Sequence, residues 1–304
     1  MGMLVIFGKS LAGSQAPANT ARPQARAPLL DEHMVHAMTE FIRASSWQRE
    51  PSGLFTTSID PRWLQGKGAY GGLLSAGLLR CMATVVDAAR RAPRTLHVHY
   101  CAPAKVGPLQ TEVIIERVGA TMITLSARSR QEGKVVTLAT ATFAVPKSKP
   151  APGAHFNDAR MPEVDKPDTL EPIPLDVPLM PTFSQFLEYR FCIGEPPYSG
   201  STEPARTGGW VRLREPCPID AFVIAALIDS YPPAVLPRLD GPRAAASVNL
   251  TVDFHALPPL APDAQLLLHS SSRVGDGGTT DEQQDLWSAD GVLIASCRQL
   301  VALL

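Results

Sequence analysis

The chain has 304 residues, of which 45% are hydrophobic, enough to bury a large core in one or two domains. The formal net charge is −1 at pH 7, and the lysines and arginines are scattered, which excludes a basic face for nucleic acid or an anionic membrane. Apolar segments are interrupted well short of the roughly 18 residues that a membrane span needs. We therefore expect a soluble, cytoplasmic protein without nucleic acid or membrane partners.

Residues 1–33 are expected to be a disordered or leader segment. Their short apolar run has no basic region before it and is followed by a tract rich in proline, alanine and arginine. The five cysteines are far apart in the sequence and form no C-x-x-C pair, which is typical of small buried residues in a reducing compartment.

Residues 66–71 read GKGAYG and match the pattern G-x-G-x-x-G. In a dinucleotide-binding turn a buried strand precedes the glycines, because they close a strand-to-helix corner against the pyrophosphate. The preceding residues, FTTSIDPRWLQ, contain no run of four apolar residues. The pattern therefore favours a buried helix that begins at glycines, and we expect no cofactor.

The helix predicted at residues 71–89 is apolar on nearly every face, which is typical of a helix buried in the core. The segments that follow are rich in valine, isoleucine and threonine with period-two alternation, which predicts antiparallel strands. These strands are predicted at residues 95–103, 109–119, 120–133 and 134–146.

A proline-rich linker is predicted at residues 148–182, because repeated prolines disfavour both helix and central strand. Beyond it the same order recurs, beginning with an apolar helix at residues 219–231 for which Asp220 is the N-cap. Strands are then predicted at residues 247–258, 264–274, 282–291 and 292–304, the last two joined by an Asp-Gly hairpin turn.

This repeated order indicates an internal duplication. A helix that is hydrophobic all round is satisfied only if a curved sheet wraps it, which describes a hotdog fold. The sequence therefore predicts an α+β double hotdog, with one repeat at residues 34–147 and the other at residues 183–304.

Three further sequence patterns do not predict a catalytic or metal-binding site. His97 and His99 alternate along one strand face without a recognisable third ligand, so we expect a packed or pocket-lining pair and no metal site. Neither a G-x-S-x-G elbow nor a Cys-His signature is present, which argues against a covalent serine or cysteine hydrolase. We interpret the run TTDEQQD at residues 279–285 as a solvated loop entering a strand.

Five stretches across both halves resemble the acyl-CoA thioesterase II type of double-hotdog proteins and the wider thioesterase-like group. They read GAYGGLLSAGLL, LHVHYCAPAKVGP, LIDSYPPAV, SVNLTVDFHALP and WSADGVLIASCRQLVAL. The resemblance implies an acyl-CoA substrate, thioester hydrolysis without a cofactor, and chains that often pair further into homo-oligomers.

The resemblance also implies a catalytic set made of an aspartate on the second helix, a hydroxyl residue at the start of the next strand and a glutamine on the last strand. The corresponding residues are Asp229, Ser247, where the family pattern often has threonine, and Gln299. Asn249 and Asp253 depart from the family pattern, so the pocket lining is expected to differ and no acyl-chain preference is carried over.

Thioester hydrolysis needs a positioned water, a carboxylate that takes its proton and donors for the developing oxyanion. Asp229 lies among apolar neighbours, where an unpaired carboxylate costs several kcal/mol unless it is bonded or functional. The alternative is an exposed acid near the helix end, before Pro232. Ser247 and Gln299 carry neutral polar groups that can hold a water without competing for its proton.

Gly71 and Gly72 open the first predicted helix, whose first amides carry a partial positive charge. We expect an oxyanion site there, facing Asp229 across the interface between the halves; close packing of the helix start is the alternative. Aligning ATATFAV with ASCRQLV places Phe143 opposite Gln299, and residues 68–86 contain no acid. We therefore expect one active site per chain.

The sequence thus predicts an acyl-CoA thioesterase that releases a carboxylic acid and free CoA. A non-catalytic protein that binds acyl-CoA or another acyl ligand is the alternative. A hotdog hydratase or dehydratase normally has a His-Asp pair near the helix, and neither predicted core helix contains a histidine.

Overall fold

The structure is a computed structural model that describes residues 38–88, 90–146 and 156–304, so the segment predicted at residues 1–33 lies outside the described residues. The N-terminal half contains α2 (Glu40–Ser45), β1 (Gln48–Arg49), β2 (Phe55–Ile59), β3 (Leu64–Gln65), β4 (Gly68–Ala69), α3 (Gly71–Thr84), β5 (Ala92–Tyr100), β6 (Gly107–Val118), β7 (Met122–Gln131) and β8 (Lys134–Ala144). The C-terminal half contains β9 (Leu187–Gly194), β10 (Arg206–Leu213), α4 (Ala221–Leu227), β11 (Ala245–Phe254), β12 (Leu266–Ser271), β13 (Gly275–Asp276), β14 (Thr279–Ser288) and β15 (Leu293–Leu303).

Within the described ranges, thirteen strands form one continuous sheet, in which β5 of the first half pairs antiparallel with β11 of the second. Outward from this junction the order is β5-β8-β7-β6-β2 on one side and β11-β15-β14-β12-β10 on the other. In each half the first strand after the helix lies at the junction and the last strand of the repeat lies next to it. This repeated order confirms the predicted double hotdog.

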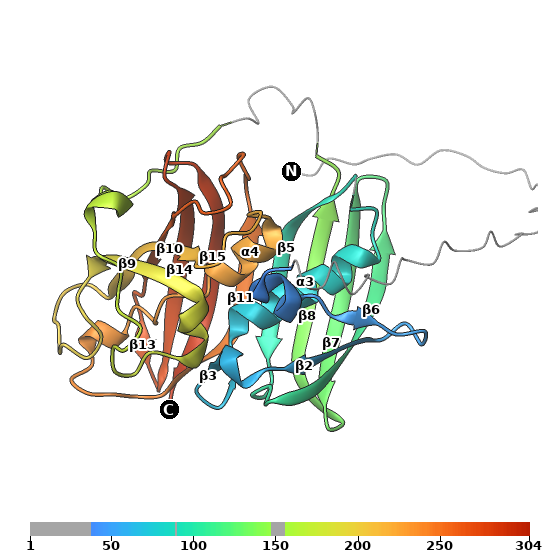
Figure 1. Cartoon of the computed structure of the whole chain (residues 1–304), viewed down its shortest axis with the longest axis horizontal. Helices are drawn as coiled ribbons and strands as arrows, with labels where there is room; N and C mark the ends of the chain where they lie inside the picture. The colour runs from blue at the N-terminus through green and yellow to red at the C-terminus, as the bar shows by residue number, and fades with distance from the viewer. Residues whose placement is uncertain (1–37, 89, 147–155) are drawn as a thin grey trace, which may run out of the picture. The chain divides into compact units, whose positions relative to one another are not determined.

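Both core helices form within the predicted apolar segments, although α3 ends at Thr84, earlier than the predicted end at residue 89 (Figure 1). Helix α3 buries ten of its fourteen residues, as expected for a segment without a polar face. Helix α4 begins after Asp220, whose carboxylate accepts hydrogen bonds from the amides of Phe222 and Val223, which confirms the predicted N-cap.

Helix α4 ends at Leu227, four residues earlier than predicted. Pro232 and Pro233 follow closely, and proline both lacks an amide donor and disfavours helical conformation in the residue before it. Asp229 therefore lies in the turn that follows the helix and not on the helix itself.

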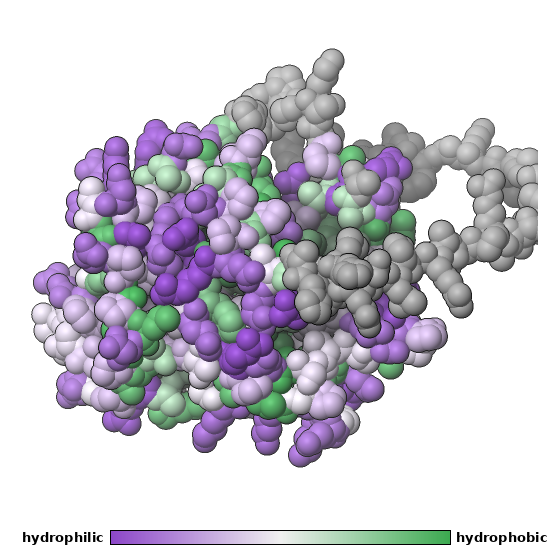
Figure 2. All heavy atoms as spheres, viewed as in Figure 1, coloured by the Kyte–Doolittle hydropathy of each residue, from purple (hydrophilic) through white to green (hydrophobic). Residues whose placement is uncertain are grey.

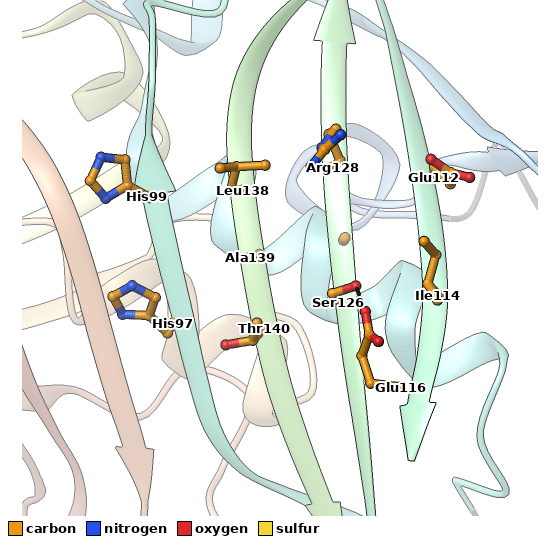
Figure 3. A pocket seen from close by; sticks show the side chains of 11 residues that line it. His97, His99, Glu112, Ile114, Glu116, Ser126, Arg128, Leu138, Ala139 and Thr140 are labelled. Atoms are coloured by element: carbon orange, nitrogen blue, oxygen red, sulfur yellow. Dashed lines mark hydrogen bonds between the residues drawn. The ribbon is translucent and has the colours of Figure 1, made fainter. Parts of the chain in front are cut away.

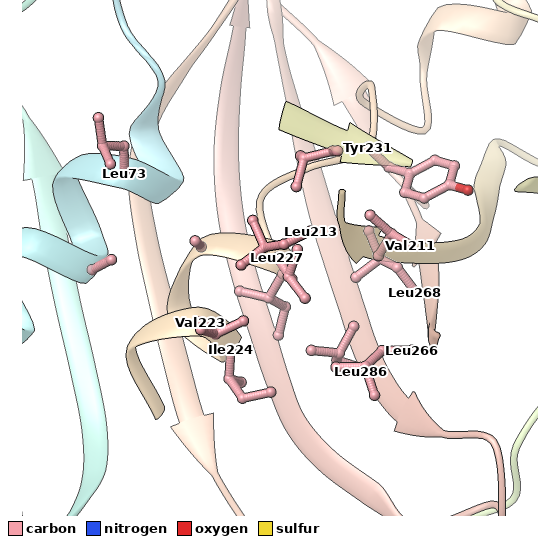
Figure 4. Packing of buried hydrophobic residues seen from close by; sticks show 14 of the residues in the cluster. Leu73, Val211, Leu213, Val223, Ile224, Leu227, Tyr231, Leu266, Leu268 and Leu286 are labelled. Atoms are coloured by element: carbon pink, nitrogen blue, oxygen red, sulfur yellow. The ribbon is translucent and has the colours of Figure 1, made fainter. Parts of the chain in front are cut away.

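The core of the second half is built by α4 packing on the sheet. Figure 4 shows Val223, Ile224 and Leu227 of α4 facing Leu268 and Leu286 of the strands, and all five side chains are buried. Each fully buried aliphatic side chain stabilises the fold by about 1.5–3 kcal/mol. This packing fixes the end of α4, and with it the turn that carries Asp229.

The two helices also pack against each other, so the halves share an interior. The ring of Tyr70 stacks on Phe183 with centroids 3.8 Å apart, and its hydroxyl donates to the carbonyl of Ala226 in α4. A Cβ atom at Gly72 would lie 2.5 Å from that same carbonyl oxygen. Glycine at position 72 therefore permits the close approach of α3 to α4.

The interpretation of residues 279–285 as a solvated loop is wrong, whereas the strand predicted from residue 282 is present. These residues lie in β14, a strand of the sheet, and alternate side chains of Thr280, Glu282 and Gln284 are buried. Charge alone favours solvent exposure, but these polar residues follow the period of two that places every second side chain on the inner face of the sheet. Their burial brings polar groups under the end of α4.

No helix among the described residues is both long and apolar enough to cross a membrane. On the face drawn in Figure 2, hydrophilic residues are spread widely and hydrophobic ones appear in small separate groups.

Candidate active site

The site lies where the end of α4, the start of α3 and the inner face of β15 meet. Asp229 is only 9% exposed, which contradicts the alternative of a solvated acid near the helix end. Gln299 reaches it from β15 and Gly72 from the first turn of α3. Residues from both halves therefore meet at this carboxylate.

A chain of hydrogen bonds links the three residues of the predicted catalytic set. The side-chain amide of Gln299 donates to Oδ1 of Asp229 at 2.7 Å and to Oε1 of Gln284 at 3.1 Å. The hydroxyl of Ser247 donates to Oε1 of Gln299 at 2.8 Å. Gln299 is thus held from three sides and presents its amide to the acid in one orientation.

An irregularity in β11 turns Ser247 toward this chain. The β11–β15 register shifts between Ser247 and Asn249, so Val248 is an additional residue on β11, as in a β-bulge. Without the shift, alternation from the buried Leu250 would point residue 247 to the opposite face. With it, Ser247 lies opposite Val301, which is buried on the inner face.

A cavity of about 10 Å³ lies among these side chains, near the lower limit of about 10–15 Å³ that one water molecule requires. Its lining is mostly polar and consists of Gln65, Asp229, Tyr231, Pro233, Ser247, Glu282, Gln284, Gln299 and Val301. A small space with several hydrogen-bonding groups suits a single water molecule in contact with the carboxylate.

Burial raises the pKa of Asp229 from 3.8 to about 7, while the hydrogen bonds from Gln299 and the Gly72 amide act in the opposite direction. Removing a carboxylate from water disfavours its charged form, and two donors restore part of that stabilisation. The acid therefore changes its protonation state near neutral pH, where a general base works most effectively.

The two glycines predicted as oxyanion donors lie directly against Asp229. The amide of Gly72 is near enough to the carboxylate to lower its pKa. A Cβ atom at Gly71 would lie 2.6 Å from Oδ2 of Asp229 and 3.0 Å from the Tyr100 hydroxyl oxygen. The amide of Gly71 is the first in the helix and has no intrahelical acceptor.

Sequence reasoning missed the polar residues that β14 contributes to the cavity. Glu282 and Gln284 are 1% and 4% exposed, and Glu282 lies directly opposite Gln299 in the β14–β15 register. Gln65, from the short strand β3, also lines the cavity. The available signal was the period-two spacing of Thr280, Glu282 and Gln284 before the apolar residues of the same strand.

The family departures at positions 249 and 253 lie away from the cavity. Asn249 accepts a hydrogen bond from the backbone amide of Leu300, and Asp253 is exposed. His97 and His99 line a separate hollow of about 560 Å³, on the sheet face turned away from α3 (Figure 3). The prediction of a pocket-lining pair is confirmed, and among the described residues no three side chains form a metal-ligand cluster.

The equivalent position in the first half is apolar. Phe143, which aligns with Gln299, lies opposite Ile123 in the β7–β8 register, and both side chains are buried. The corresponding pair of the second half is Gln299 and Glu282. The two repeats therefore differ at this position: the second has a pair of polar side chains and the first has a pair of hydrophobic ones.

Two family models match the chain in sequence. The acyl-CoA thioesterase N-terminal domain matches residues 59–144, and the acyl-CoA thioesterase C-terminal domain matches residues 150–303. A search of curated proteins gives no match.

Solved structures with the same fold extend over most of the chain. A conserved protein of unknown function with a hot dog fold from Alicyclobacillus acidocaldarius is 26% identical, with a TM-score of 0.77, and the match covers 88% of this chain and 98% of that one. The TesB protein of Mycobacterium avium subsp. paratuberculosis is 21% identical over 87% and 98% of the two chains, with a TM-score of 0.72. An acyl-CoA thioesterase II, TesB2, from Mycobacterium marinum is 18% identical over 87% and 98%, with a TM-score of 0.69.

The family models cover both halves in the order in which the fold places them, and the solved structures share the double-hotdog architecture. The chain belongs to the acyl-CoA thioesterase family.

Proposed function

We propose that the protein hydrolyses acyl-CoA thioesters to a carboxylic acid and free CoA, with Asp229 as the general base for a water molecule. The observation that carries this proposal is the buried Asp229 carboxylate, bonded to Gln299 and bordering a cavity of the size of one water. A carboxylate without a function would be costly at this depth, whereas one that takes a proton from water benefits from a pKa near neutrality.

In the proposed reaction the cavity water attacks the thioester carbonyl carbon while Asp229 accepts one of its protons. The carbonyl oxygen becomes an oxyanion in the tetrahedral intermediate. When the intermediate collapses, the carbon–sulfur bond breaks, and protonated Asp229 returns its proton to the leaving thiolate sulfur. The second water proton leaves with the product acid, so the enzyme is restored without a covalent intermediate.

The neighbouring groups have separate tasks in this scheme. Gln299 and Ser247 hold the water and fix the orientation of the acid without competing for the proton, because both carry neutral polar groups. The amides of Gly71 and Gly72 at the start of α3 are the donors proposed for the oxyanion, because the first amides of a helix have no intrahelical acceptor. The first half contributes this helix start and the wall of the site, which gives one active site per chain.

The direct test measures thiol release from a panel of acyl-CoA substrates of increasing chain length, with the wild type and Asp229→Ala. Steady release of CoA that disappears in the variant is the expected result. Saturable binding of acyl-CoA without turnover by the wild type would replace this function with that of an acyl-ligand binding protein. Equal turnover by both proteins would refute the role of Asp229.

A further inference from the structure

A second buried carboxylate borders the same cavity. Glu282 is 1% exposed, and burial raises its pKa to about 7. None of the ion pairs among the described residues includes it. An acid buried this deeply without a cation needs hydrogen-bond donors at both oxygens.

Both oxygens of Glu282 have such donors, and one donor belongs to the segment that carries Asp229. The amide of Ala234 donates to Oε1 at 2.7 Å, and the hydroxyl of Ser270 donates to Oε2. Pro232 and Pro233 have no amide hydrogen and have fixed φ angles, so the segment between Asp229 and Ala234 is stiff. A bond that fixes Ala234 therefore restrains the position of Asp229 as well.

The first half provides an internal comparison. There the residues equivalent to Glu282 and Gln299 are Ile123 and Phe143, which lie opposite each other and are buried. The hotdog repeat therefore packs at this position without any polar group. A buried glutamate occurs in the repeat that also contains Asp229, which ties it to the site and not to the requirements of the fold.

We propose that Glu282 is a positioning residue of the active site, which holds the Asp229–Ala234 turn so that the Asp229 carboxylate borders the water cavity. This inference rests on the proposed function, and in it Glu282 exchanges no proton with the substrate. A glutamine can make the same contacts, because its oxygen accepts from the Ala234 amide and its amide group donates to the Ser270 hydroxyl.

Two substitutions distinguish between two roles of Glu282, holding the Asp229–Ala234 turn and supplying a negative charge. In Glu282→Ala the Ala234 amide loses its acceptor, so we expect kcat to fall at least about tenfold while KM changes less than about threefold. In Glu282→Gln we expect both constants within about threefold of the wild type. Asp285→Asn is the matched control, because Asp285 is on the same strand but bonds Ser296 on the other sheet face, and it should have no effect.

Hydrogen exchange of the peptide containing Ala234, followed by mass spectrometry, tests the restraint without relying on activity. Exchange should be faster in Glu282→Ala and unchanged in Glu282→Gln. If the alanine variant does not fold, Glu282→Met keeps the volume, removes the acceptor and should show the same effects.

Wild-type kcat and wild-type exchange in the alanine or methionine variant would overturn the proposal. So would a glutamine variant as inactive as Asp229→Asn, because that result would assign a proton-transfer role to Glu282. A wild type that hydrolyses no acyl-CoA defeats the proposed function alone, and the exchange experiment still decides whether Glu282 holds the turn.

Discussion

Asp229→Asn should lower activity and raise stability at alkaline pH. The asparagine keeps the side-chain size, and its oxygen can still accept the hydrogen bond that Gln299 donates at 2.7 Å. What it loses is the capacity to take a proton. General-base catalysis contributes about 10²–10⁴ in rate, so kcat should fall by about that factor while KM changes less than about threefold.

The stability change follows from the shift in the Asp229 pKa, from 3.8 to about 7 on folding. Between these values the folded state holds a proton that the unfolded state has lost, so stability falls as pH rises through this window. Above it the buried carboxylate costs roughly 4 kcal/mol, at about 1.4 kcal/mol per pKa unit. Asparagine removes that cost but pairs less well with the Gly72 amide, which costs about 1–3 kcal/mol.

We therefore expect Asp229→Asn to be about 1–3 kcal/mol more stable than the wild type above about pH 8, with no such gain below about pH 4. Thiol release under saturating acyl-CoA measures kcat, and urea unfolding at the two pH values measures stability. The reasoning is refuted if the variant keeps kcat within about threefold of the wild type, or if its stability relative to the wild type is the same at both pH values.

Three further results are expected. Gly71→Ala places a Cβ atom 2.6 Å from Oδ2 of Asp229 and should lower kcat at least about tenfold. The control is Gly241→Ala, which should not change kcat because a Cβ atom there has no neighbour within 4 Å. Equal kcat values for the two variants would contradict this prediction. Gln299→Ala removes the hydrogen bonds to Asp229 and Ser247 and should lower kcat about tenfold or more; an unchanged kcat would show that the acid is oriented without it. Because the base must be ionised, log kcat should rise with pH and level off above an apparent pKa of about 7, and a pH-rate profile without this acid limb would exclude Asp229 as the base.

Much of the fold could be predicted from the sequence, because the patterns that indicate its helices and strands are local. The apolar character of α3 and α4 and the period-two alternation of the major strands are properties of short windows. The sequence did not predict strands β9 and β10 or the short strand β2. Strand β2 pairs with β6 and β10 pairs with β12, which are distant in the sequence, and β9 is an edge strand that pairs with β10. The early end of α4 could have been anticipated from Pro232 and Pro233.

Only some residues of the candidate active site could be predicted from the sequence. Resemblance supplied Asp229, Ser247 and Gln299, and the structure brings these residues into one hydrogen-bonded chain. It did not supply Glu282, because a charged residue in a polar run favours solvent until its partners are known. It also gave no indication of the register shift in β11 that turns Ser247 inward, since this shift depends on the pairing with β15.

The most direct test of water activation by Asp229 is a single turnover with enzyme in excess over acyl-CoA, in water enriched in the heavy oxygen isotope. Direct attack by the cavity water predicts that the acid released in this first turnover carries the heavy isotope. An unlabelled product acid, with the label later found on Asp229, would show that the carboxylate itself attacks the thioester and would contradict the account.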